Sequence, residues 1–183
     1  MMPLGKKVAD LITWARLLQF PLFVWLGLTQ GSEALPVAVG LVILNWTADS
    51  FDGPLARRKP FPRQTQIGAR DLEVDMLVSC GLLAYLTATG LLGRPVALFY
   101  LLIWGLYFGL KGISGAPGML FQAPIYGWFI VVSFREAAPF GWLMVLWIGI
   151  AMAVTWPRFP REMVPGFLKG MRAFWQKRST DRE

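Results

Sequence analysis

Apolar residues are concentrated in six long runs along the chain, and short polar or turn-forming segments separate them. Several of these runs approach the roughly 20 residues that a helix needs to cross the hydrocarbon core of a bilayer. Glycine and proline occur in most of the gaps, as expected of turns. The pattern predicts an all-α integral membrane protein with six transmembrane helices, at about residues 11–29, 34–51, 76–92, 96–110, 119–134 and 138–156.

The composition supports a membrane protein and argues against a soluble globular domain. The 183 residues are 55% hydrophobic and 16% charged, whereas soluble domains carry roughly 25% charged residues. The first apolar run follows basic residues, as in a signal peptide, but Asp10 and Arg16 interrupt it and no small-x-small cleavage pattern follows. We therefore expect a retained first helix and a single membrane domain over residues 1–183.

Basic residues predict the orientation. With the N-terminus in the cytoplasm, six spans leave only Arg94 and Arg135, of eighteen basic residues, on the outer side. Both termini and the loop between the second and third helices are then cytoplasmic. The net charge of +7 matches anionic lipid headgroups, so membrane lipids and no nucleic acid are the expected partners. The expected location is a bacterial inner membrane.

Two further patterns concern the ends of the chain and its assembly. In the tail, residues 157–183, apolar side chains share one helical face, which predicts a short amphipathic helix in the interface. A similar interfacial end is expected before the first span. Gly105 and Gly109 form a small-xxx-small pair that would let another helix approach, in a homodimer for example.

Four aspartates flank the loop between the second and third apolar runs. Asp49 and Asp52 are three residues apart where one run ends, and Asp71 and Asp75 are four apart where the next begins. Residues three and four apart share a helical face, so each pair is expected to line one face. If the two faces meet, four like charges converge, and protonation or bound cations must relieve the repulsion.

The chain has no histidine and only one cysteine, Cys80, which lies inside an apolar run. Acid–base or metal chemistry therefore depends on carboxylates. Hard oxygen ligands favour Mg²⁺, Mn²⁺ or Ca²⁺, and four carboxylates can hold two such ions for displacement at phosphorus. Gly53 would let a ligand approach, and Arg57 and Arg58 fit phosphate. Alternatively, the basic part of this loop is simply a solvated cytoplasmic segment.

These residues resemble the signature of the CDP-alcohol phosphotransferase family, Asp-x-x-Asp-Gly-x-x-Ala-Arg followed, after a spacer, by Gly-x-x-x-Asp-x-x-x-Asp. The matching positions are Asp49, Asp52, Gly53, Ala56, Arg57, Asp71 and Asp75. Near the N-terminus, Thr13, Arg16 and Pro21 match the family's Asn-x-x-Thr-x-x-Arg segment and its proline, with Asp10 in place of asparagine. Ile67 stands where the second glycine is usual, and the glycine is Gly68 instead.

The resemblance implies a reaction and a role for each residue. Asp49, Asp52 and Asp71, with Asp75, would bind two Mg²⁺ or Mn²⁺ ions. Asp75 would also be the general base that takes the proton of an acceptor alcohol. The substrates would be CDP-diacylglycerol and a small polar alcohol, with glycerol 3-phosphate as first choice, and CMP would be released. The CDP group would contact the remaining motif residues, Gly53, Ala56, Arg57 and Gly68.

Several other polar residues have weaker assignments. Arg16 would reach an acceptor phosphate or extend to lipid headgroups, and Lys111 would contact a phosphate or anchor the fourth helix at headgroups. We expect Glu73 to be structural, and Asn45 and Thr47 to form hydrogen bonds between helices. Two alternative functions stay open: a cation transporter or channel, which would need charges near the midplane, and a non-catalytic relative that binds CDP-lipid.

Overall fold

The structure is a computed structural model that describes residues 13–57 and 71–156, together with Arg161, Pro165, Leu168 and Lys169; at residues 49–57 and 71 it describes the backbone alone. Residues 13–17 are helical. A short 3₁₀ helix, η1 (Gly31–Ala34), follows α2. The α-helices are α2 (Gln19–Thr29), α3 (Leu35–Arg57), α4 (Asp71–Ala88), α5 (Arg94–Lys111), α6 (Gly115–Glu136) and α7 (Ala138–Val154).

Each of the six predicted apolar segments coincides with a helix, and the described ranges contain no β-strand. By length and composition, Gly31–Ala48 and Gly115–Glu136 could each cross a membrane, and Ala138–Val154 is a shorter apolar helix. The all-α fold is therefore confirmed for the described residues, whereas six spans and the orientation stay predictions. The predicted interfacial helix over residues 157–183 lies outside the described residues, apart from four isolated positions.

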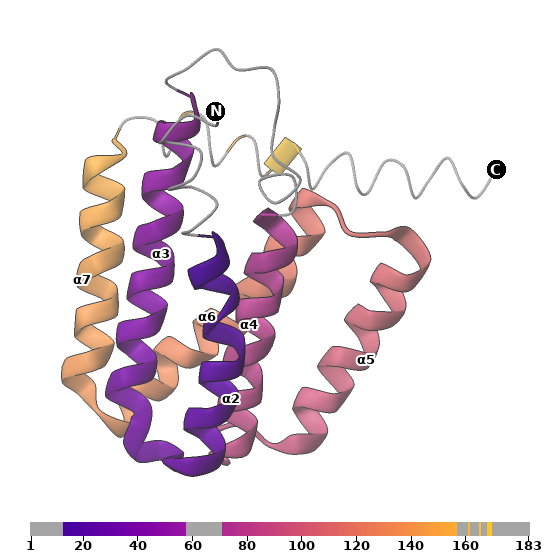
Figure 1. Cartoon of the computed structure of the whole chain (residues 1–183), viewed down its shortest axis with the longest axis vertical. Helices are drawn as coiled ribbons and strands as arrows, with labels where there is room; N and C mark the ends of the chain where they lie inside the picture. The colour runs from indigo at the N-terminus through magenta and orange to yellow at the C-terminus, as the bar shows by residue number, and fades with distance from the viewer. Residues whose placement is uncertain (1–12, 58–70, 157–160, 162–164, 166–167, 170–183) are drawn as a thin grey trace.

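The helices are arranged around α2 and α4 (Figure 1). α2 packs against α4 and α3, α6 packs against α4, and α7 packs against both α3 and α6. The C-terminal end of α3 and the N-terminal end of α4 lie at the same end of the bundle, the upper end in Figure 1. This arrangement brings the two halves of the aspartate pattern to one end of the protein.

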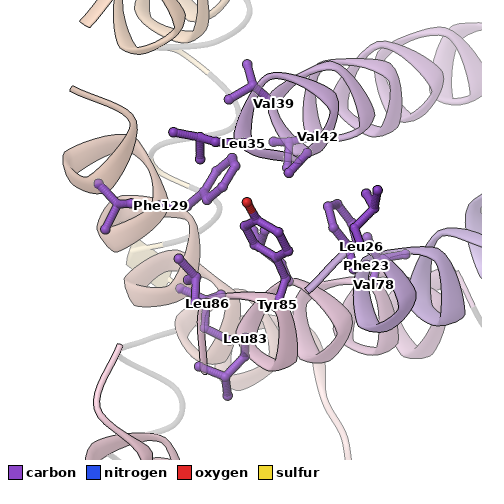
Figure 2. Close-up of a cluster of buried hydrophobic side chains, with 14 of the residues drawn as sticks. Phe23, Leu26, Leu35, Val39, Val42, Val78, Leu83, Tyr85, Leu86 and Phe129 are labelled. Carbon is purple, nitrogen blue, oxygen red and sulfur yellow. The ribbon is translucent and has the colours of Figure 1, made fainter. Parts of the chain in front are cut away.

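Tyr85 of α4 lies at the centre of the hydrophobic core (Figure 2). Its side chain is fully buried and its ring packs edge-on against Phe129 of α6, with 6.5 Å between the ring centroids. Val39 and Val42 of α3 and Phe23 of α2 surround it. Four helices thus contribute to one core below the end that carries the aspartates.

Two glycines allow α2 and α4 to pack closely. A Cβ atom on Gly81 would lie 2.9 Å from the Cα atom of Phe20, and one on Gly27 would lie 3.1 Å from the Cα atom of Tyr85. Phe20, near the start of α2, contacts Gly81 of α4. Gly27, later in α2, contacts Tyr85, which is also later in α4. The two helices are therefore parallel, and they approach at backbone distance.

α5 stands apart from the other helices (Figure 1) and contacts them mainly through aromatic side chains. The Tyr100 hydroxyl donates a hydrogen bond to the carbonyl of Phe121 in α6, and the Trp104 ring packs edge-on against the Phe121 ring. Nothing lies within 4 Å of a Cβ atom built on Gly105 or Gly109. Among the described residues no other helix packs against that pair, and the homodimer stays a prediction.

Candidate active site

The motif residues lie on the last turns of α3 and the first turn of α4. α3 extends to Arg57 and so includes Asp49, Asp52, Gly53 and Ala56, and α4 begins at Asp71. The predicted helical spacing of both aspartate pairs is therefore confirmed for the backbone. Gly68 lies outside the described residues. Glu73, the other acidic residue of the first turn of α4, is exposed.

Asn45 shows which face of α3 continues into the motif. It precedes Asp49 by four residues and Asp52 by seven, so the three residues lie along one stripe of the helix. The Asn45 side chain is 3% exposed, and its Oδ1 atom accepts a hydrogen bond of 3.0 Å from Nε of Arg16. The stripe that carries Asp49 and Asp52 therefore includes Asn45, one turn before Asp49, and at Asn45 it faces the interior of the bundle.

Arg16 also forms an ion pair with Asp75 of α4, through its Nη2 atom and the Oδ1 atom of the carboxylate. One guanidinium thus joins Asn45 of α3 to Asp75 of α4. Because both partners contact the same planar group, the faces of α3 and α4 that bear the motif meet across Arg16. The structure describes the side chain of Asp75, and the positions of the other three aspartates follow from their helices.

The ion pair is buried. Arg16 is 1% exposed, and the Oδ1 atom of Asp75 is also buried. Removing one member of such a pair leaves an uncompensated charge and costs about 3–5 kcal/mol. The guanidinium therefore lies among the helices and is not exposed at the protein surface.

Other buried polar side chains surround this ion pair. Thr13 and Gln19 lie one turn before and one turn after Arg16, and Ser79 lies one turn after Asp75; all three are buried. The Ser79 hydroxyl donates to the carbonyl of Met76. Intramembrane polar groups are costly and mark functional sites by default. The Arg16–Asp75 ion pair therefore belongs to a set of buried polar residues on helical residues 13–17, α2 and α4.

A second interhelical contact fixes α3 from its other side. Trp147 of α7 donates its indole N–H to the hydroxyl of Thr47 at 2.9 Å, and that hydroxyl donates to the carbonyl of Ile43. The Trp46 ring packs against both Trp147 and Tyr126, with centroids 5.5 Å apart in each case. The predicted interhelical hydrogen bonds of Asn45 and Thr47 are both confirmed.

The pairing of Arg16 with Asp75 was not predicted from the sequence. A signal was available, because an arginine inside an apolar helix requires a partner. Lys111, by contrast, is exposed at the last turn of α5, and its proposed contact with phosphate or headgroups stays a prediction.

The donor set fits divalent cations in its chemistry. All four candidate ligands are carboxylates, which Mg²⁺ and Mn²⁺ prefer, and the Arg16 contacts bring their two helices together. Among the side chains that the structure describes, no three acidic, cysteine or histidine residues form a cluster. Of the four aspartates, the structure describes the side chain of Asp75 alone, so the metal site stays a proposal.

Comparison with known proteins identifies the family. The family model for CDP-alcohol phosphatidyltransferases matches residues 6–156, which include all helices from α2 to α7 and the complete aspartate motif. No curated protein and no solved structure gave a significant match. The matched region covers most of the 183 residues. The chain is therefore a membrane protein of the CDP-alcohol phosphatidyltransferase family, whose reaction is the transfer of a phosphatidyl group in phospholipid synthesis.

Proposed function

We propose that this protein transfers the phosphatidyl group of CDP-diacylglycerol to a small polar alcohol and releases CMP. Glycerol 3-phosphate is the proposed acceptor, and the reaction takes place at the cytoplasmic face of a bacterial inner membrane. The observation that carries the proposal is the meeting of the two motif faces at Arg16, because it places Asp75 beside the helix stripe that bears Asp49 and Asp52. Family membership supplies the reaction class.

The residues of the motif would have two roles, metal binding and CDP binding. Asp49, Asp52 and Asp71, together with Asp75, would hold two Mg²⁺ or Mn²⁺ ions. When bound, such ions neutralise the pyrophosphate and stabilise charge that develops at phosphorus. Gly53, Ala56, Arg57 and Gly68 would contact the CDP group. Arg57 offers a guanidinium that matches phosphate geometry.

Asp75 would act as the general base. Its carboxylate accepts the proton of the acceptor hydroxyl, and the resulting oxygen nucleophile attacks the phosphorus that bears diacylglycerol. A new phosphorus–oxygen bond forms to the acceptor while the phosphoanhydride bond breaks, and the bridging oxygen leaves with CMP. Because the chain contains no histidine, a carboxylate is the natural base.

The location of the carboxylates favours this reaction over cation transport. A transport pathway places ionisable groups near the bilayer midplane. Here Asp49 and Asp52 lie in the last turns of α3, and Asp71 and Asp75 lie in the first turns of α4, at one end of the bundle. That placement suits a substrate whose headgroup enters from the aqueous side and whose acyl chains stay in the membrane.

A direct assay tests the proposal. Purified protein in mixed micelles receives CDP-diacylglycerol, Mg²⁺ or Mn²⁺ and one acceptor at a time: glycerol 3-phosphate, inositol phosphate, serine or a phosphatidyl lipid. We expect CMP release and a new phospholipid, identified by mass spectrometry, with glycerol 3-phosphate. Turnover with another acceptor would show that the proposed acceptor is wrong and would support the proposed reaction. Absence of CMP with every acceptor, alongside retained CDP binding, would instead support a non-catalytic relative.

A further inference from the structure

We propose that Arg16 is a positioning residue that fixes Asp75 relative to the metal-binding stripe of α3, and that Asn45 acts through Arg16. This inference rests on the proposed function. It assigns to the buried Arg16 a role different from direct contact with an acceptor phosphate. It also extends the site beyond the aspartate motif, to a residue of the N-terminal helix and a residue of α3.

The planar guanidinium of Arg16 links its contacts with Asn45 and Asp75. Arg16 donates from Nε to Asn45 and pairs with Asp75 through Nη2. These two nitrogen atoms belong to one rigid planar group, so the direction of one contact sets the direction of the other. Asn45 therefore orients the guanidinium, and the guanidinium orients the carboxylate.

The Asp75 side chain is only partly buried. Its Oδ1 atom is buried and pairs with Arg16, yet the side chain as a whole is 21% exposed. The exposed part must then lie on the remainder of the side chain, which includes Oδ2. Arg16 thus holds one oxygen, and the proposed mechanism assigns the acceptor hydroxyl to the other oxygen, Oδ2.

The three residues in these contacts come from three different helical segments. Arg16 precedes α2, Asn45 belongs to α3 and Asp75 belongs to α4. Asn45 is one turn from Asp49, so a shift of Arg16 changes the distance between the base and the stripe that would hold the ions. A misplacement of about 1 Å at a reacting group can cost about 100-fold in rate.

The competing role is direct binding of a substrate phosphate. That role predicts a higher KM for the acceptor when Arg16 is replaced, with little change for Asn45 variants. Positioning predicts a lower kcat with little change in KM for either substrate, because bound substrates meet a misplaced base. It also predicts that lysine fails to replace arginine, since an ammonium group cannot present two donors in fixed directions.

The experiment is a double-mutant cycle on the full-length protein in mixed micelles. Arg16→Gln, Arg16→Lys, Asn45→Ala and the double variant Arg16→Gln/Asn45→Ala are compared in kcat, in KM for both substrates and in thermal unfolding. We expect kcat to fall about 100-fold for Arg16→Gln, following the cost of misplacement. The double variant should be no slower than Arg16→Gln alone, because residues that act as one unit are not additive.

Two controls match these substitutions. Arg135→Gln removes an exposed arginine at the last turn of α6, and Ser133→Ala removes a buried hydroxyl that bonds within α6. Both should keep kcat within about twofold, as expected of sites away from the chemistry. Asn45→Ala keeps the Arg16–Asp75 charge pair, so it tests the idea if Arg16→Gln does not fold.

The outcomes separate the two proposals. A wild-type protein that releases no CMP with any acceptor overturns the proposed function and this inference with it. An active wild type whose Arg16 and Asn45 effects on kcat are additive, or whose Arg16 variants change only KM, overturns the positioning role alone. Coupling in thermal unfolding without coupling in kcat would show a purely structural contact and would also overturn it.

Discussion

Gly81 of α4 lies against Phe20 of α2 so closely that a Cβ atom on Gly81 would be 2.9 Å from the Cα atom and 3.1 Å from the carbonyl oxygen of Phe20. Backbone atoms cannot move aside as a flexible side chain can. The contact therefore fixes the spacing between α4, which carries Asp75, and α2, which directly follows the helical residues 13–17 that include Arg16.

Replacing Gly81 with alanine should separate these helices. We expect Gly81→Ala to lower the free energy of unfolding by about 1–3 kcal/mol, the usual cost of overpacking. The measurement is thermal unfolding in detergent. Gly40→Ala is the matched control, because nothing lies within 4 Å of a Cβ atom at Gly40 in α3. Equal stability of the two variants would contradict the close packing.

Asp75→Asn should abolish most of the turnover while preserving the shape of the side chain. General-base catalysis contributes about 10²–10⁴-fold, so kcat for CMP release should fall by at least 100-fold on that basis. Glu73→Gln removes an exposed carboxylate from the same turn of α4 and serves as the control. If both variants retained wild-type kcat, Asp75 would not be the base.

Chelation of divalent ions should stop the reaction reversibly. Four carboxylates without an imidazole ligand would form a hard-oxygen site, so EDTA should remove activity and Mg²⁺ or Mn²⁺ should restore it. Manganese binding can also be followed by electron paramagnetic resonance without turnover. Asp49→Asn should weaken that binding, whereas Glu33→Gln, in η1 (Gly31–Ala34), should not. Full activity after exhaustive chelation would argue against a metal-dependent enzyme.

The hydrogen bond from Trp147 to Thr47 should stabilise the packing of α7 against the middle of α3. Hydrogen bonds between membrane helices contribute about 0.6 kcal/mol on average, so Trp147→Phe should reduce the free energy of unfolding by about 1 kcal/mol, which also includes lost packing. Trp142→Phe is the control, since Trp142 is an exposed tryptophan of the same helix. A double-mutant cycle with Thr47→Val should then show coupling, and independent effects would contradict the contact.

The helices were predictable because long apolar runs separated by turn residues leave few other solutions in a membrane. The structure matches each run with a helix, and it extends α3 through the motif to Arg57. Helical spacing also predicted that each aspartate pair would share a face. These predictions depend on local sequence, which is why they could be made without knowing how the helices pack.

Contacts between helices were harder to predict. The sequence drew attention to Gly105 and Gly109, which no other described part of the chain approaches, whereas Gly27 and Gly81 form close contacts between α2 and α4. Small residues are frequent in membrane helices, so their spacing alone does not identify a partner. Arg16 interrupts an apolar run, but Asn45 and Asp75, which contact it, are distant in sequence and become evident as partners only when three helical segments are packed together.

The burial of Arg16 has a consequence for biogenesis. This residue leaves the ribosome before either partner: Asn45 follows 29 residues later, and Asp75 is synthesised later still. During that interval neither Asn45 nor Asp75, the two residues that contact Arg16 from α3 and α4, is available to it. The buried Arg16–Asp75 ion pair can therefore form only after α4 has been synthesised, so the proposed active site is assembled late in biogenesis.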